Sequence, residues 1–155
     1  MNVNALVGEF SPLIYRFALA KTGNTDLAQD IAQQTFLILF EKKPRFDSQD
    51  AMRVWLVRTA QNLILNERKQ HRNTKTVSTE DITQIAWQDE SLFELKELLN
   101  TLPDILRECT VLYYIEDMQT SDIAKALGIS HSNVKIRLKR ARDILLKKYT
   151  EEELL

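Results

Sequence analysis

The chain has 155 residues, enough for one ordinary domain or two small ones and too few for most large enzyme scaffolds. Three glycines and three prolines argue against a turn-rich β-sandwich or barrel, so we expect an all-α protein of long helices with few connections. The net charge of −1 hides an uneven distribution, with net +5 in residues 51–76, −8 in residues 77–119 and +6 in residues 120–148. Nucleic acid responds to the local field within about 10 Å, so the two basic segments are candidate DNA-binding regions. Two ordinary solvated helix faces would give the same charge pattern, and charge leaves both interpretations open.

The sequence contains few residues that could hold a metal or form a disulfide. Its single cysteine, Cys109, excludes an internal disulfide and a thiolate zinc cage, and only His71 and His131 provide imidazoles. We therefore expect no metal and no cofactor. No uncharged apolar run approaches the ~20 residues needed to span a bilayer, and the N-terminus has no basic segment followed by an apolar core. These features predict a cytoplasmic protein with no direct membrane insertion.

Proline and glycine mark the expected ends of the first helix. Ser11 followed by Pro12 is typical of a helix N-cap and first helical position, so a helix is predicted to begin there. Whether the preceding segment continues into it through a kink stays open. Residues 22–24 end this helix, and either Asn24 or Thr25 caps the next one.

Apolar residues at helical spacing predict two further long helices, over residues 25–42 and, after a loop, over residues 51–72. The buried face of the second is expected to consist of four apolar residues: Met52, Leu56, Ala60 and Leu63. Its opposite face gathers an aromatic residue, amides and cations: Trp55, Arg58, Asn62, Asn66 and Lys69. This combination suits unstacked bases, because each stacked base contributes ~1–3 kcal/mol and amides can hydrogen-bond exposed base edges. A tryptophan at helical spacing is also typical of a core position beside solvated cations, so that alternative stays open.

The helical pattern fails after residue 72 and returns near residue 91. Residues 73–90 are rich in Thr, Ser and Asp and are predicted to be a flexible linker between two small helical domains, residues 1–72 and 91–155. Helices are expected over residues 91–101 and 104–116, and two shorter periodic segments follow, separated by Gly128.

The last two segments form a pattern typical of a helix-turn-helix. Ile123, Ala124 and Leu127 provide the inner face of a short helix, Gly128 suits a left-handed turn, and Ser130 is a good N-cap for the second helix. The second helix is expected to bury four apolar residues: Val134, Leu138, Ala141 and Leu145. An amphipathic helical hairpin with a Lys/Arg-rich surface is the alternative.

The opposite face of this second helix suits a recognition helix. Short polar residues such as Ser132 can reach base edges in the major groove, and cations such as Lys135 and Arg140 can neutralise phosphates. Ile136 also lies on this face, where contact with a thymine methyl group would explain an apolar residue.

Motifs in consistent order resemble the extracytoplasmic-function (ECF, group IV) branch of the sigma-70 family of bacterial RNA polymerase sigma factors. AQDIAQQTF at residues 28–36 is similar to region 2.2, and Trp55-Leu56 followed by Ala60-Gln61-Asn62 is similar to regions 2.3 and 2.4. Leu102-Pro103, Asp122-Ile123-Ala124, Leu127-Gly128-Ile129-Ser130 and Arg140-Ala141-Arg142 follow region 4 in order and spacing. The family usually has acidic residues at positions 29 and 34 and a small polar residue at position 136.

The resemblance implies a specificity subunit that directs core RNA polymerase to promoters and is not an enzyme. Its implied partners are the β′ and β subunits of polymerase, promoter DNA and an anti-sigma factor. The resemblance assigns contact with the β′ clamp helices to Asp30, Gln33, Gln34 and Leu37. It assigns the −10 element to the face of Trp55, Arg58, Asn62, Asn66 and Lys69, beside the loop of residues 44–50. It assigns the −35 element to Ser130, His131, Ser132, Asn133, Lys135, Ile136, Arg137, Lys139 and Arg140.

Two other classes of function remain to be separated by experiment. A stand-alone helix-turn-helix transcriptional regulator would bind duplex DNA tightly without polymerase, usually as a dimer on a palindrome. A protein-interaction adaptor would bind no DNA in any context.

Overall fold

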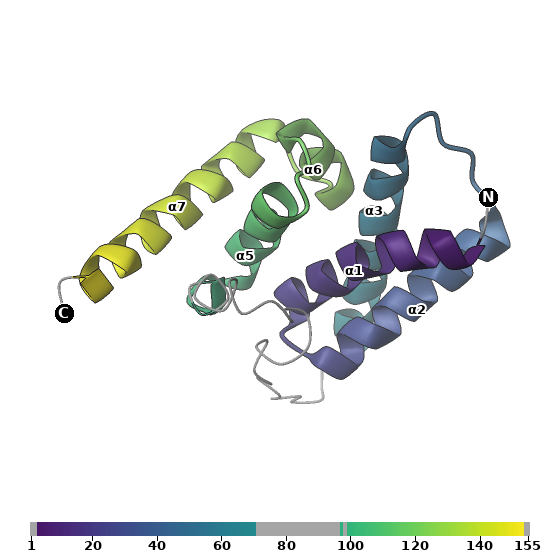
Figure 1. The fold of residues 1–155 in the computed structure, drawn as a ribbon, viewed down its shortest axis with the longest axis horizontal. Helices are drawn as coiled ribbons and strands as arrows, with labels where there is room; N and C mark the ends of the chain where they lie inside the picture. Colours follow the sequence, from purple (N-terminus) through teal and green to yellow (C-terminus); the bar gives the residue numbers. More distant parts are fainter. Residues whose placement is uncertain (1–2, 71–96, 98, 154–155) are drawn as a thin grey trace.

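The computed structural model describes residues 3–70, 97 and 99–153, and every regular element within these ranges is helical (Figure 1). The all-α prediction is therefore confirmed. In chain order the elements are α1 (Val3–Thr22), α2 (Thr25–Lys42), α3 (Gln49–Gln70), α5 (Asp104–Thr110), the π-helical turn η3 (Val111–Ile115), α6 (Thr120–Leu127) and α7 (His131–Glu153).

The first helix begins earlier than the sequence predicted. α1 runs unbroken from Val3 to Thr22 with Pro12 inside it, so the prediction that Ser11 and Pro12 start the helix is wrong. Apolar residues on both sides of the proline, Phe10 and Leu13, are buried in the same core. Continuous packing therefore outweighs the backbone hydrogen bond that Pro12 cannot donate.

The next two helices each have an N-cap, formed by the polar side chain that precedes the first helical residue. The Asn24 side chain accepts a hydrogen bond from the backbone N–H of Leu27 at 3.0 Å, which settles the choice between Asn24 and Thr25. Ser48 Oγ accepts from the N–H of Ala51 at 3.0 Å, and α3 begins at Gln49, two residues before the predicted start.

The predicted helix over residues 104–116 is confirmed in position but changes type along its length. It is α-helical in α5 and becomes the π-helical turn η3 from Val111. The expected linker over residues 73–90 and His71 lie outside the described residues. Most of the helix predicted over residues 91–101 also lies outside them, and the domain boundaries stay predictions.

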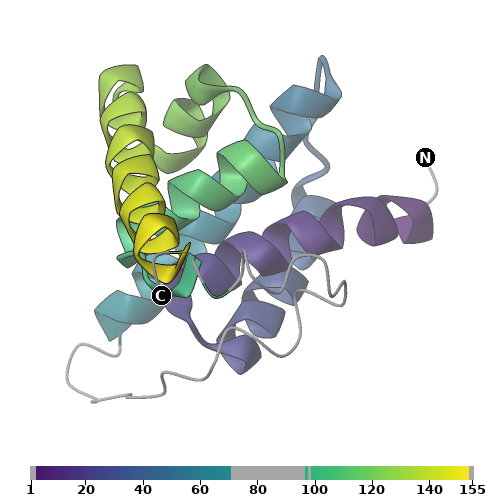
Figure 2. The same cartoon turned by 60° about the vertical axis from the view of Figure 1, so that its left-hand side comes forward.

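The N-terminal and C-terminal helices pack side by side around a continuous core. Figure 1 shows α6 beside the start of α3 and α5 beside α1, and Figure 2 shows the same pairing after a 60° turn. Fully buried side chains from both halves belong to one apolar cluster, among them Phe17, Leu56, Leu112, Ile123 and Val134. The described helices therefore form one packed body, in which the N-terminal and C-terminal groups of helices lie against each other.

Candidate nucleic-acid and polymerase interfaces

Helices α6 and α7 form the predicted helix-turn-helix. Gly128 ends α6 with a left-handed backbone (φ 70°), a conformation that costs glycine little. The N–H groups of Gly128 and Ile129 both donate to the carbonyl oxygen of Ala124, at 2.9 and 3.1 Å. These two bonds fix the turn and so fix the angle at which α7 leaves it.

The N-terminus of α7 has the cap that the sequence predicted. Ser130 Oγ accepts a hydrogen bond from the N–H of Asn133 at 3.1 Å. Val134, Leu138 and Ala141 are buried. The opposite side of the helix is therefore held toward solvent.

Most of the residues assigned to the −35 element share that solvent side. The exposed members are Ser130, His131, Ser132, Lys135, Ile136, Lys139 and Arg140. Ile136 is apolar and yet 48% exposed. An apolar side chain held among cations in this way suits a contact with the methyl group of thymine.

Two residues of the predicted −35 set lie differently. Asn133 and Arg137 are half-buried and lie four positions apart, so they share one side of α7. Arg137 Nη1 lies 3.6 Å from a carboxylate oxygen of the buried Glu108. The structure therefore places Arg137 against the interior of the protein and apart from the exposed members of the set.

One contact at the start of α7 was not predicted from the sequence. Thr120, the first residue of α6, has its Oγ1 2.5 Å from Nε2 of His131, the first residue of α7. The contact ties the N-terminal ends of the two helices together. Helix N-termini are favourable positions for phosphate groups. We therefore add Thr120 to the surface that includes His131.

The residues that the sequence assigned to the −10 element lie on α3, and most of them are on its exposed side. Arg58, Asn62, Asn66 and Lys69 are exposed. Trp55 is half-buried, and its ring meets that of Phe46 edge-on with centroids 5.9 Å apart. One side of the tryptophan packs against the core, and the other side borders the exposed face of α3. Its position is therefore compatible with a core residue and with a residue that contacts bases.

This face is hollowed by a cavity of about 470 Å³ between α2 and α3. Trp55, Arg58, Asn62 and Asn66 line it from α3, and Lys69 does not. Its other wall includes Ile38 and Lys42 of α2, which were not predicted from the sequence. The spacing of residues along α3 could not indicate them, because they come from another helix.

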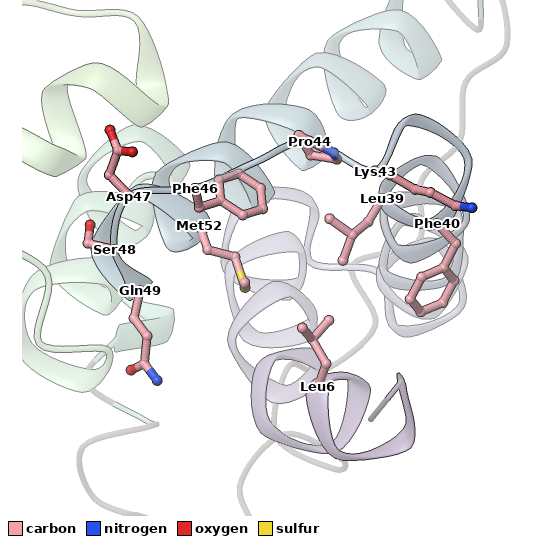
Figure 3. Close-up of a pocket in the computed structure, with 10 residues that line it drawn as sticks. All are labelled: Leu6, Leu39, Phe40, Lys43, Pro44, Phe46, Asp47, Ser48, Gln49 and Met52. Carbon is pink, nitrogen blue, oxygen red and sulfur yellow. The ribbon is translucent and has the colours of Figure 1, made fainter. Parts of the chain in front are cut away.

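A second and more apolar cavity, of about 620 Å³, lies where the loop of residues 44–50 meets the ends of α1, α2 and α3 (Figure 3). Phe46 and Met52 point into it, and Asp47, Ser48 and Gln49 form its polar edge (Figure 3). Because Phe46 also contacts Trp55, the two cavities lie on either side of one aromatic pair.

The four residues assigned to polymerase contact lie together on the outer side of α2. Asp30, Gln33 and Gln34 are exposed, and Leu37 is 64% exposed. Gln33 and Leu37 also line a groove of about 1000 Å³ between α1 and α2. A leucine with most of its surface in water beside polar neighbours suits a partner that covers it.

Within the ranges that the structure describes, no group of three His, Cys, Asp or Glu residues could hold a metal ion. No described helix is both long enough and apolar enough to cross a membrane.

Two family models match consecutive parts of the chain. The model for sigma-70 region 2 matches residues 6–74, and the model for sigma-70 region 4 matches residues 92–145. The ECF RNA polymerase sigma factor SigL of Mycobacterium tuberculosis is 30% identical, over 88% of this chain and 82% of that protein. The chain belongs to the ECF sigma factors.

Other ECF sigma factors are similar over most of the chain. SigM of Bacillus subtilis is 29% identical over 94% of this chain and 93% of SigM. Among solved structures, the sigma factor RpoE in complex with the anti-sigma factor NepR from Bartonella quintana matches with a TM-score of 0.74 and 24% identity. That match covers 93% of this chain and 94% of RpoE, and it shows the same fold.

Proposed function

We propose that this ECF sigma factor binds core RNA polymerase in the cytoplasm and directs it to promoters, without catalysing a reaction itself. The observation that supports this most strongly is the presence of two chemically different nucleic-acid surfaces on one chain. The α7 surface has the form of a duplex reader, whereas the α3 surface offers a half-buried tryptophan, amides and cations around a cavity. A sigma factor needs both kinds of surface, since it recognises a closed duplex at −35 and separated strands at −10.

The α3 surface is assigned to the −10 element. Unstacking a base costs a few kcal/mol, so a melted promoter persists only if the protein captures the freed bases. Trp55 provides an aromatic ring, Asn62 and Asn66 provide amides, and Arg58 provides a cation within one cavity. The loop cavity around Phe46 provides an apolar recess next to it.

The −10 assignment is tested by permanganate reactivity of promoter thymines in the assembled polymerase. We expect Asn62→Ala and Arg58→Ala to reduce the reactivity while leaving binding to core polymerase unchanged. The matched control is Arg53→Ala, which removes the same charge from α3 at a position off this face. Normal reactivity in both test variants, or an equal loss in the control, would contradict the assignment.

The α2 surface is assigned to the clamp helices of β′, and the region 4 unit to the flap of β. Asp30 and Gln33 are three residues apart on one exposed side of α2, next to the exposed Leu37. We expect the double variant Asp30→Ala/Gln33→Ala to lose co-purification with core polymerase and to keep its helical circular dichroism. A wild-type yield of the complex would contradict the assignment.

We also propose an anti-sigma factor as a partner. A structurally similar sigma factor, RpoE, was solved in complex with the anti-sigma factor NepR. A stand-alone helix-turn-helix regulator is not favoured, because the chain matches both region 2 and region 4 of the sigma-70 family.

A further inference from the structure

The cavity beside Trp55 has two walls, and the −10 assignment uses only the wall formed by α3. The opposite wall comes from α2, where Ile38 and Lys42 line the cavity. These two residues are four positions apart and therefore share one side of α2. The cavity volume of about 470 Å³ lies within the range of about 300–1000 Å³ that is typical of sites for small ligands.

The residues that line this cavity include two cations and no carboxylate. The cations are Lys42 on α2 and Arg58 on α3. Among the residues that the structure describes, carboxylates pair with other cations, such as Arg16 and Lys21, and with neither Lys42 nor Arg58. The two charges therefore favour an anion at the cavity.

The charged and apolar groups of the cavity differ in their exposure. Lys42 and Arg58 are exposed, whereas Ile38, Trp55 and Leu63 are half-buried. The cations therefore lie toward the rim, in water, and the apolar surface lies deeper. This arrangement suits a ligand that has a flat, weakly polar ring next to an anionic group, as an unpaired nucleotide has.

The remaining polar groups of the cavity suit the edge of a base. The hydroxyl of Thr59 donates to the carbonyl oxygen of Trp55 at 2.8 Å, so its proton is already used within α3. Asn62 and Asn66 are exposed at the cavity, and each amide can both donate and accept a hydrogen bond. A base held between the two helices thus meets apolar surface and amides, while its phosphate meets the cations.

We propose that α2 provides the second wall of the single-strand site: Ile38 packs against the base captured at Trp55, and Lys42 neutralises a phosphate beside that base. This inference rests on the proposed function, because it concerns how the −10 strand is held. The strand then lies in the groove between two helices and not along the surface of α3 alone.

The main alternative occupant of the α2 wall is polymerase. Ile38 follows Gln34 by four positions, so the side of α2 that is assigned to polymerase continues into the cavity wall. The charge pattern favours DNA, because an exposed lysine and an exposed arginine without carboxylate partners lie on the two walls of one cavity. The experiment therefore measures DNA binding and polymerase binding separately.

The probe is a fluorescein-labelled single-stranded DNA that holoenzyme containing the wild-type protein selects from a random library, after removal of strands that core polymerase alone retains. Fluorescence anisotropy gives its affinity for holoenzymes that contain Lys42→Ala, Lys42→Arg or Ile38→Ala. The matched control is Lys147→Ala, which removes the same charge from an exposed position on α7. Affinity for core polymerase is measured without DNA, and circular dichroism establishes that each variant is folded.

We expect Lys42→Ala to weaken strand binding and to reduce its dependence on salt. One phosphate contact to a single strand contributes about 0.7 to the slope of log K against log [salt], so the ratio of wild-type to Lys42→Ala affinity should fall ~2.6-fold between 50 and 200 mM NaCl. Lys42→Arg keeps the charge and should restore the slope. Ile38→Ala should lower the affinity by roughly 5-fold with an unchanged slope, because it removes only apolar contact.

A wild-type affinity and salt slope for Lys42→Ala, or the same change in Lys147→Ala, would overturn the inference. A loss of affinity for core polymerase as large as the loss for the strand would also overturn it, because polymerase would then cover Lys42. If no strand is selected beyond those that core alone retains, the proposed function fails and the inference fails with it. A selected strand that wild type and Lys42→Ala bind equally removes the inference alone.

Discussion

Replacement of Lys21 by methionine should destabilise the fold far more than loss of a surface lysine. Methionine preserves most of the side-chain length and removes only the charge and the hydrogen bond to Glu108. The Glu108 side chain is 2% exposed, so its carboxylate cannot recover that interaction from water.

The size of the effect follows from the burial of the pair. Removing one partner of a buried ion pair typically costs 3–5 kcal/mol, because the other charge stays buried without compensation. Here Arg137 lies 3.6 Å from Glu108 and offsets part of the cost. We therefore expect a loss of about 3 kcal/mol in the free energy of unfolding, which lowers Tm by roughly 6–12 °C in a protein of this size.

The loss should also depend on pH. Burial raises the pKa of Glu108 above its usual range, and the charges of Lys21 and Arg137 oppose that rise. A glutamate with a raised pKa contributes stability below its ordinary value of ~4.3 and loses it as pH rises through the folded pKa. Without Lys21 the pKa of Glu108 rises further, so the variant should lose more stability at pH 8 than at pH 5.

Urea unfolding followed by circular dichroism at pH 5 and pH 8 measures both effects. Lys147→Met, at an exposed position on α7, is the matched control and should change stability by less than about 0.5 kcal/mol. A loss below about 1 kcal/mol for Lys21→Met, or an equal loss at both pH values, would refute the reasoning.

Three further predictions concern single side chains. Arg107→Lys should lower the free energy of unfolding, measured in urea, by about 3 kcal/mol. The guanidinium donates to three backbone carbonyl oxygens at 2.7–3.2 Å, and an ammonium group cannot reproduce that geometry. A loss below about 1 kcal/mol would contradict this. Burial and the neighbouring Glu108 raise the pKa of Cys109 to about 11, and the side chain is fully buried. At pH 8 iodoacetamide should therefore alkylate the native thiol at least about 100-fold more slowly than the urea-unfolded thiol, and similar rates would be inconsistent with this environment. Ile136→Ser should relax selection for thymine at one −35 position in run-off transcription on a randomised library; an unchanged sequence preference would show that Ile136 makes no base contact.

Helix caps and turns were predicted well from the sequence, because each of them depends on residues that are close together in the chain. The left-handed turn at Gly128 and the cap at Ser130 follow from side-chain and backbone chemistry within a few positions. The start of α1 was predicted wrongly for the same reason. Its path through Pro12 depends on core packing around Phe10 and Leu13, which no local rule contains.

Contacts and cavities formed by two segments far apart in the sequence were not predicted. Arg137 was assigned to DNA with its neighbours on α7, because nothing nearby in the sequence indicates that Glu108 lies beside it. Ile38 and Lys42 were not predicted as part of the cavity beside Trp55, because α2 supplies them to a surface defined on α3. The Lys21–Glu108 contact joins positions 87 residues apart and became visible only in the folded structure.

Run-off transcription with purified core polymerase tests the central claim most directly. A template bearing −10 and −35 elements is transcribed with core alone, with core and the wild-type protein, and with core and Asn62→Ala. We predict specific transcripts only when the wild-type protein is present, and a strong reduction with Asn62→Ala. Tight binding of the protein to promoter duplex without polymerase, together with no polymerase-dependent transcript from any of a library of promoter sequences, would contradict the claim.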